Sequence, residues 1–82
     1  MNIGDSHFTG AEEWIRKAIE ADNRNNVRFT LGLDHALYSY YFKRKGNRIK
    51  AQEELGQAIE ILQKCGADGW VEKYEKELAA LL

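Results

Sequence analysis

The sequence predicts an all-α protein of about four antiparallel helices arranged in helix-turn-helix repeats. Two segments, residues 11–20 and 51–60, share the pattern Ala-x-Glu-x-(Ile/Leu)-x-x-Ala-Ile-Glu. On a helix of 3.6 residues per turn, the small and branched residues of this pattern fall on one stripe. The chain also lacks proline, the residue that most often interrupts helices. A repeated helix with small residues at fixed places is typical of a stacked helical array, which usually binds other proteins.

The size and composition fit one small globular domain. A chain of 82 residues buries only about 60% of the surface that its unfolded form exposes. A net charge of −1 gives no overall attraction to nucleic acid or to a membrane, and no apolar run is long enough to span a bilayer. The single cysteine, Cys65, excludes an internal disulfide and favours a reducing compartment, so we expect a cytoplasmic protein.

The first helix is expected over residues 9–22, after a disordered or vector-derived lead at residues 1–8. Thr9 and Glu12 have the spacing of a capping box, in which each side chain bonds a free N–H of the first turn. The polar run at residues 22–26 ends this helix. Residues 9–82 are then a single domain.

Three further helices follow at residues 27–45, 48–64 and 69–81. The start of the helix over 27–45 is open: it begins near Val27 or only after Gly32. Three cationic residues and then Gly46 suit its negatively polarised, left-handed end, and Asp68 is expected to cap the helix over 69–81. Short connections predict antiparallel packing. Gly56 lies inside the helix over 48–64. We interpret it as the point where the last helix crosses this helix closely, with the Trp70 side chain over the space left by the glycine.

Residues 32–65 resemble one tetratricopeptide repeat (TPR), a helix-turn-helix unit of about 34 residues. Gly46 takes the place of the turn glycine in that family. The small and large positions on either side of the turn are Ser39, Phe42, Ala51, Leu55 and Ala58. Three positions depart from the family pattern: His35 replaces tryptophan, Tyr38 replaces leucine, and Gln63 replaces proline. The resemblance implies that the helix over 9–22 is the second helix of a preceding repeat.

The offset between the two repeated segments, from Ala11 to Ala51, is longer than the period of the TPR family. We assign the surplus to the Asn-rich linker and to a lengthened helix over 27–45.

The end of the chain, at residues 66–70 and 72–74, is similar to the C-terminal TPR-like regions of large bacterial signalling proteins, such as nucleotide cyclases, ATPase-bearing regulators and kinases. This resemblance implies a non-catalytic protein-protein interaction module, the C-terminal part of a signalling or regulatory protein. Its partner would be a protein, a peptide or other domains of the parent. The alternative is an unrelated small helical bundle that has alanines at the same spacing.

The family pattern implies a binding surface on the helix over 27–45. Its ligand-facing positions hold Leu33, Ala36, Tyr40, Lys43 and Arg44. Leu33, Ala36 and Leu37 occupy several places where family members that grip a peptide carboxylate hold polar residues, so we expect an apolar or aromatic anchor with an acidic flank instead. The alternative is that these residues cover the first helix or a missing repeat.

No motif of an enzyme is present, and we expect no cofactor and no metal site. His35 and Cys65 are expected to pack in the interior, His35 as a partly buried side chain and Cys65 as a small filler. Two other functions remain open. One is a homodimer that stacks the open side of the first helix against its mate. The weaker one is nucleic-acid binding by the basic cluster at residues 43–50, beside aromatic residues.

Overall fold

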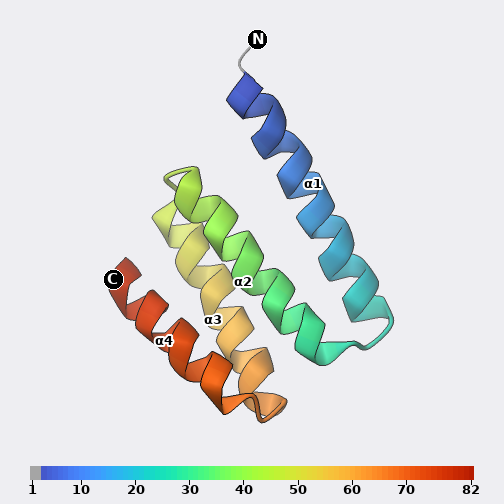
Figure 1. The fold of residues 1–82 in the computed structure, drawn as a ribbon, viewed down its shortest axis with the longest axis vertical. Coiled ribbons are helices and arrows are strands. Elements are labelled where there is room, and N and C mark those ends of the chain that lie inside the picture. The colour runs from blue at the N-terminus through green and yellow to red at the C-terminus, as the bar shows by residue number, and fades with distance from the viewer. Residues whose placement is uncertain (1–2) are drawn as a thin grey trace.

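The computed structural model describes residues 3–82, with side chains described from residue 10 onward. Its helices are α1 (Ile3–Arg24), α2 (Arg28–Arg44), α3 (Arg48–Lys64) and α4 (Asp68–Leu81), and there is no strand among these residues. The helices lie side by side in chain order, each antiparallel to the next (Figure 1). The prediction of an all-α fold with four helices is therefore confirmed.

The turns between the helices are equally spaced along the chain. Each turn has a residue with positive φ at its centre: Asn26 (59°), Gly46 (80°) and Gly66 (71°). The next N–H donates to a carbonyl of the preceding helix, from Val27 to Asp22, Asn47 to Phe42 and Ala67 to Leu62, at 2.9–3.0 Å. Glycine and asparagine adopt this left-handed conformation at low cost. The offset between the two repeated segments is therefore made of two equal helix-turn units.

This regularity corrects where we placed the surplus of that offset. The Asn-rich linker at residues 25–27 is as short as the other two turns, so it contributes nothing. Helices α2 and α3 are both 17 residues long, so the surplus lies in long helices. Of the two possible starts for α2, the one near Val27 is right, since α2 begins at Arg28 and Gly32 lies inside it.

Helix α1 begins at Ile3, which corrects the predicted start at residue 9; residues 1–2 of the expected lead lie outside the described residues. Thr9 is inside the helix, so it does not occupy the N-cap position that the predicted capping box requires. A helix without proline extends at little cost once formed. The Glu12 carboxylate accepts a hydrogen bond from a side chain of α2. At the other end of the chain, Asp68 is the first residue of α4, with Ala67 as its N-cap.

The closest packing lies between α2 and α3. Ala51, Ala58 and Leu62 of α3 are completely buried, and the Ser39 hydroxyl of α2 donates to the Ala51 carbonyl at 2.7 Å. A Cβ added to Gly32 would lie 2.8 Å from Leu62 Cγ, too close for any other residue without a shift of that side chain. Small residues on both helices therefore let the two backbones approach.

Gly56 does not have the role that we predicted for it. A Cβ added there would meet nothing within 4 Å, so α4 does not cross α3 closely at this point. Trp70 packs instead on Tyr74, with ring centroids 5.9 Å apart, and on Phe29 of α2 at 6.4 Å. Helix α4 therefore contacts its neighbours here through aromatic rings and not through a small residue of α3.

Helix α1 is held to α2 by a polar cluster around Glu12. Its carboxylate accepts hydrogen bonds from the Tyr38 hydroxyl at 2.8 Å, from Arg16 at 3.0 Å and from the Tyr41 hydroxyl at 3.3 Å. The Tyr38 hydroxyl is the largest cause of a lowered pKa for Glu12, with Arg16 assisting and burial opposing. Below this cluster, Ile15 is buried against α2.

The two repeated segments have related surroundings, with one difference. Ile15 and Leu55, at the same position of the repeat, are both buried. Ala51 is buried under α2, whereas Ala11 is exposed at the edge of a space between α1 and α2. Trp14 is 63% exposed, whereas Glu54, at the same position of the repeat in α3, is mostly buried against His35 of α2. Helix α1 therefore ends the stack with an open face.

Candidate functional site

Three of the predicted binding residues line one groove. Leu33, Ala36 and Tyr40 lie one turn apart along α2, so they share a face of that helix. Across from them, α4 supplies the other wall. We call this space, of about 340 Å³, the α2–α4 groove. It is lined by Leu33, Ala36, Leu37, Tyr40, Trp70, Lys73, Tyr74 and Glu77.

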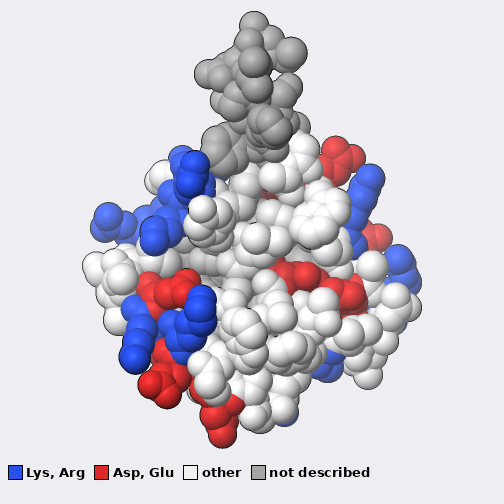
Figure 2. Space-filling view, viewed as in Figure 1, with Lys and Arg blue, Asp and Glu red and all other residues white. Residues whose placement is uncertain are grey.

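A second groove, also of about 340 Å³, lies between α1 and α2. We call it the α1–α2 groove. It is lined by Ala11, Ile15, Leu37, Tyr40, Tyr41 and Arg44. Leu37 and Tyr40 line both grooves, and we call this pair the central ridge. Although apolar or aromatic, Leu37 is 40% exposed and Tyr40 is 56% exposed. Figure 2 shows uncharged surface over the upper part of α2, with acidic side chains farther down between α2 and α1.

The predicted cations lie beyond the ridge, where α2 ends. The Arg44 guanidinium lies 5.9 Å from the centroid of the Tyr40 ring and donates to its hydroxyl oxygen at 3.3 Å. Lys43 is exposed and lines a small hollow between α2 and the end of α4. Lysine and arginine side chains gather at this end of α2 in Figure 2. The five predicted residues thus share one helix, but only four of them line the two grooves, and Lys43 lies in the neighbouring hollow.

The sequence reasoning missed the residues of α4 that complete the α2–α4 groove. Trp70 and Tyr74 stack at an interplanar angle of 22°. Lys73 donates to Glu77 at 2.8 Å, and its ammonium lies 4.8 Å from the Tyr74 ring centroid. The repeat could have indicated this wall. When the offset from Ala11 to Ala51 is applied to α2, the positions of Leu33 and Leu37 correspond to Lys73 and Glu77 of α4.

His35 and Cys65 do not form a reactive pair. The His35 Nδ1 atom lies 2.7 Å from a Glu54 carboxylate oxygen on α3, and both side chains are mostly buried. This contact agrees with the expected packing role of His35. Cys65 is exposed, so its predicted role as an interior filler is wrong. It is the C-cap of α3, where the chain turns away from the core after Leu62.

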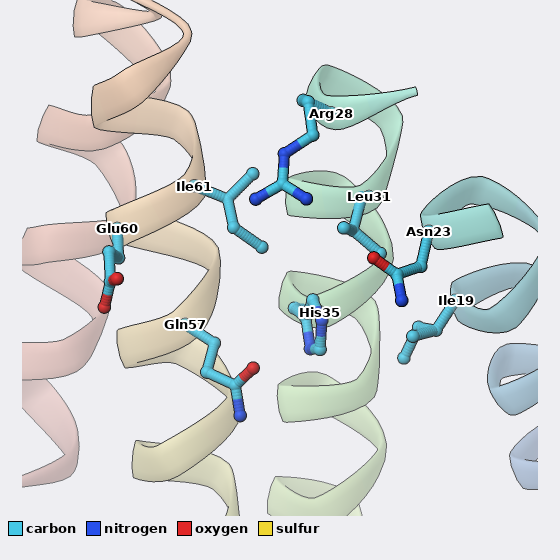
Figure 3. Close-up of a pocket in the computed structure, with 8 residues that line it drawn as sticks. All are labelled: Ile19, Asn23, Arg28, Leu31, His35, Gln57, Glu60 and Ile61. Atoms are coloured by element: carbon cyan, nitrogen blue, oxygen red, sulfur yellow. The ribbon is translucent and has the colours of Figure 1, made fainter. Parts of the chain in front are cut away.

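A third and larger space lies on the opposite side of α2, between α1 and α3. We call it the α1–α3 pocket; its volume is about 400 Å³. It is lined by Ile19, Asn23, Arg28, Leu31, His35, Gln57, Glu60 and Ile61 (Figure 3). Arg28, Leu31 and His35 lie on the side of α2 that faces away from Leu33, Leu37 and Tyr40. Unlike the grooves, this pocket is rich in polar side chains.

Comparison of the chain with models of protein families, with curated proteins and with solved structures finds no match. Within the described residues, no helix combines the length and apolar character needed to cross a membrane. A proposal for the function therefore depends on the chemistry of the grooves and the pocket described above.

Proposed function

We propose that the chain is a non-catalytic protein-interaction module of the TPR type, the C-terminal part of a larger signalling or regulatory protein in the cytoplasm. Its ligand is a protein segment with an apolar or aromatic anchor and an acidic flank. One observation carries this proposal: the exposed central ridge of Leu37 and Tyr40 lies between two grooves and ends at Lys43 and Arg44.

The apolar part of the ligand would bind on the ridge. Leu37, Tyr40 and Trp70 lie close together and keep 40–56% of their surface exposed. Grouped exposed apolar residues mark binding sites, and tyrosine and tryptophan are frequent among residues that dominate binding energy. A ligand side chain inserted beside Tyr40 would bury these faces without a change in the backbone.

The acidic flank follows from the charges at the end of α2. Lys43 and Arg44 lie one turn beyond the ridge, so a ligand that extends along α2 meets positive charge there. Arg44 is already stacked on Tyr40, which keeps its guanidinium beside the groove. Exposed charges of this kind act mainly on the rate of association and on its salt dependence, and less on affinity.

The resemblance to the TPR family supports the proposal through packing positions. Ser39, Ala51, Leu55 and Ala58, which take the small and large positions of the family pattern, are all buried between α2 and α3. Gly46, at the turn position, has φ of 80°. A single free cysteine, Cys65, supports a reducing compartment.

Selection from a displayed library of random short peptides would test the proposal. We expect enriched peptides to contain a large apolar residue followed by aspartate or glutamate. Tyr40→Ser should weaken an enriched peptide about tenfold or more, and Lys43→Gln together with Arg44→Gln should reduce the salt dependence of binding. Ile49→Ser is the matched control, because Ile49 is 70% exposed outside both grooves. Equal effects of Tyr40→Ser and Ile49→Ser would refute the site.

Homodimerisation is a second candidate, favoured by the open face of α1. Trp14 is 63% exposed there, whereas the same side of α3 is covered by α2. Sedimentation at increasing concentration would show a dimer that Trp14→Ala dissociates. A monomer at all concentrations would exclude it.

A further inference from the structure

The α1–α3 pocket has an apolar floor between two polar sides. Leu31 and Ile61 are buried, with 3% and 9% of their surface exposed, and Ile19 closes the floor from α1. The Asn23 and Gln57 side chains enter from opposite sides, from α1 and α3 (Figure 3). Neither amide group makes a hydrogen bond within the described part of the chain. Both can therefore bond a ligand above the floor.

Arg28 is the charged group of this pocket. Its side chain runs from the first residue of α2 into the space beside Ile61 (Figure 3). It makes no ion pair and no hydrogen bond to any described residue. Most ion pairs among the described residues join side chains four apart on one helix, as between Glu60 and Lys64 at 3.7 Å. Glu60 points away from Arg28, so it does not neutralise the guanidinium (Figure 3).

His35 presents a fixed nitrogen to the same space. A Glu54 carboxylate oxygen lies 2.7 Å from Nδ1, and this contact sets the orientation of the ring. The other ring nitrogen, Nε2, does not contact Glu54. The His35 side chain is only 12% exposed, so the ring cannot turn freely. With Arg28, it provides a second polar group on the α2 side of the pocket.

We propose that the α1–α3 pocket binds a small aliphatic monocarboxylate, with the carboxylate on Arg28 and the alkyl chain on Leu31 and Ile61. A guanidinium presents two parallel N–H groups that match a carboxylate. Arg28 is the one lysine or arginine among the residues that line the pocket, so its guanidinium supplies a single positive charge. A monoanion therefore fits better than a dianionic phosphate. A volume of about 400 Å³ holds a ligand of this size with room to spare.

Titration of the labelled protein with butanoate, followed by amide NMR signals at constant ionic strength and pH 7, tests this proposal. A ligand of this size is expected to bind with Kd on the order of 1–10 mM. The signals of Leu31, His35, Gln57 and Ile61 should shift and saturate. Butyramide, which has the same shape without the charge, should bind at least about tenfold more weakly.

Arg28→Gln should weaken butanoate binding about tenfold, whereas Arg48→Gln, at the first residue of α3, should leave it unchanged. Both residues are exposed, so both variants should fold, and their circular dichroism spectra verify this. Absence of saturable shifts, or equal loss in both variants, would overturn the proposal. Equal binding of inorganic phosphate would overturn the choice of a carboxylate. Tyr40→Ser should not alter butanoate binding, so this test is independent of the peptide-binding function.

Discussion

The α1–α2 interface contains a carboxyl group that opposes folding at neutral pH. One oxygen of Asp34, Oδ2, is buried and has no hydrogen-bond partner among the described residues. Burial, together with the neighbouring carboxyl of Asp22, raises the pKa of Asp34 from 3.8 to about 7. Asp34→Asn replaces the ionisable group by a neutral one of the same shape. We expect this substitution to stabilise the protein at pH 8.

The direction with pH follows from the raised pKa. Between pH 3.8 and about 7, the folded state holds a proton on Asp34 that the unfolded state has lost, so wild-type stability falls as the pH rises through this window. The full shift corresponds to about 4 kcal/mol. Because the side chain is only partly buried and water screens Asp22, we expect a gain of about 1–2 kcal/mol at pH 8. The gain should vanish near pH 3.5.

Urea unfolding followed by circular dichroism at pH 3.5, 5.5 and 8 measures this difference directly. The comparison of wild type with Asp34→Asn at each pH removes the titration of all other groups. Asp22→Asn should give part of the same gain, and the double variant should give less than the sum of the two. A gain from Asp34→Asn that is the same at pH 3.5 and pH 8 would refute the electrostatic explanation.

Four other outcomes are expected, each from thermal or urea unfolding except the last. Gly32→Ala should destabilise the protein by about 1–3 kcal/mol, since its Cβ would lie 2.8 Å from Leu62. Gly56→Ala should stabilise it by about 0.5–1 kcal/mol, because the added methyl group meets open space. Glu12→Gln should cost about 1 kcal/mol at pH 7. Because the pKa of the Glu12 carboxyl is lowered, its contribution to the stability of the wild type is present above about pH 4.5 and disappears as the pH falls further. Amide hydrogens of α4 should exchange faster than those of α2 and α3, because only Val71 and Leu81 of α4 are buried; equal rates would contradict this.

The repeat pattern was sufficient to predict the helices, because their signals are local. Alanines and branched residues at helical spacing marked α1 and α3, and Gly46 marked a turn. The first turn was less clear, since Asn26 adopts the same left-handed conformation without being glycine. Alignment of Asn26 with Gly46 and Gly66, which are equally spaced, would have placed the start of α2 at Arg28.

The contacts between helices could not be predicted in the same way. Gly32 and Gly56 look alike in the sequence, yet only Gly32 faces a neighbouring helix closely. Which side of a helix is approached depends on the rotation of its partner, and this is decided by packing of the whole core. The capping assignment of Glu12 failed for the same reason, because two of the three residues that bond it, Tyr38 and Tyr41, are on α2.

The two contacts on either side of α3 differ in a way that bears on binding. Towards α2, Gly32 and Ser39 meet buried side chains and a carbonyl of α3, so this contact is tight and has one arrangement. Towards α4, only Val71 and Leu81 are buried, and Trp70 and Tyr74 stack at the edge. Helix α4 can therefore shift at lower cost than α2. Since α4 forms one wall of the α2–α4 groove, a shift of α4 changes the width of this groove at lower cost than a movement of the central ridge on α2, which suits the ligand binding that we propose.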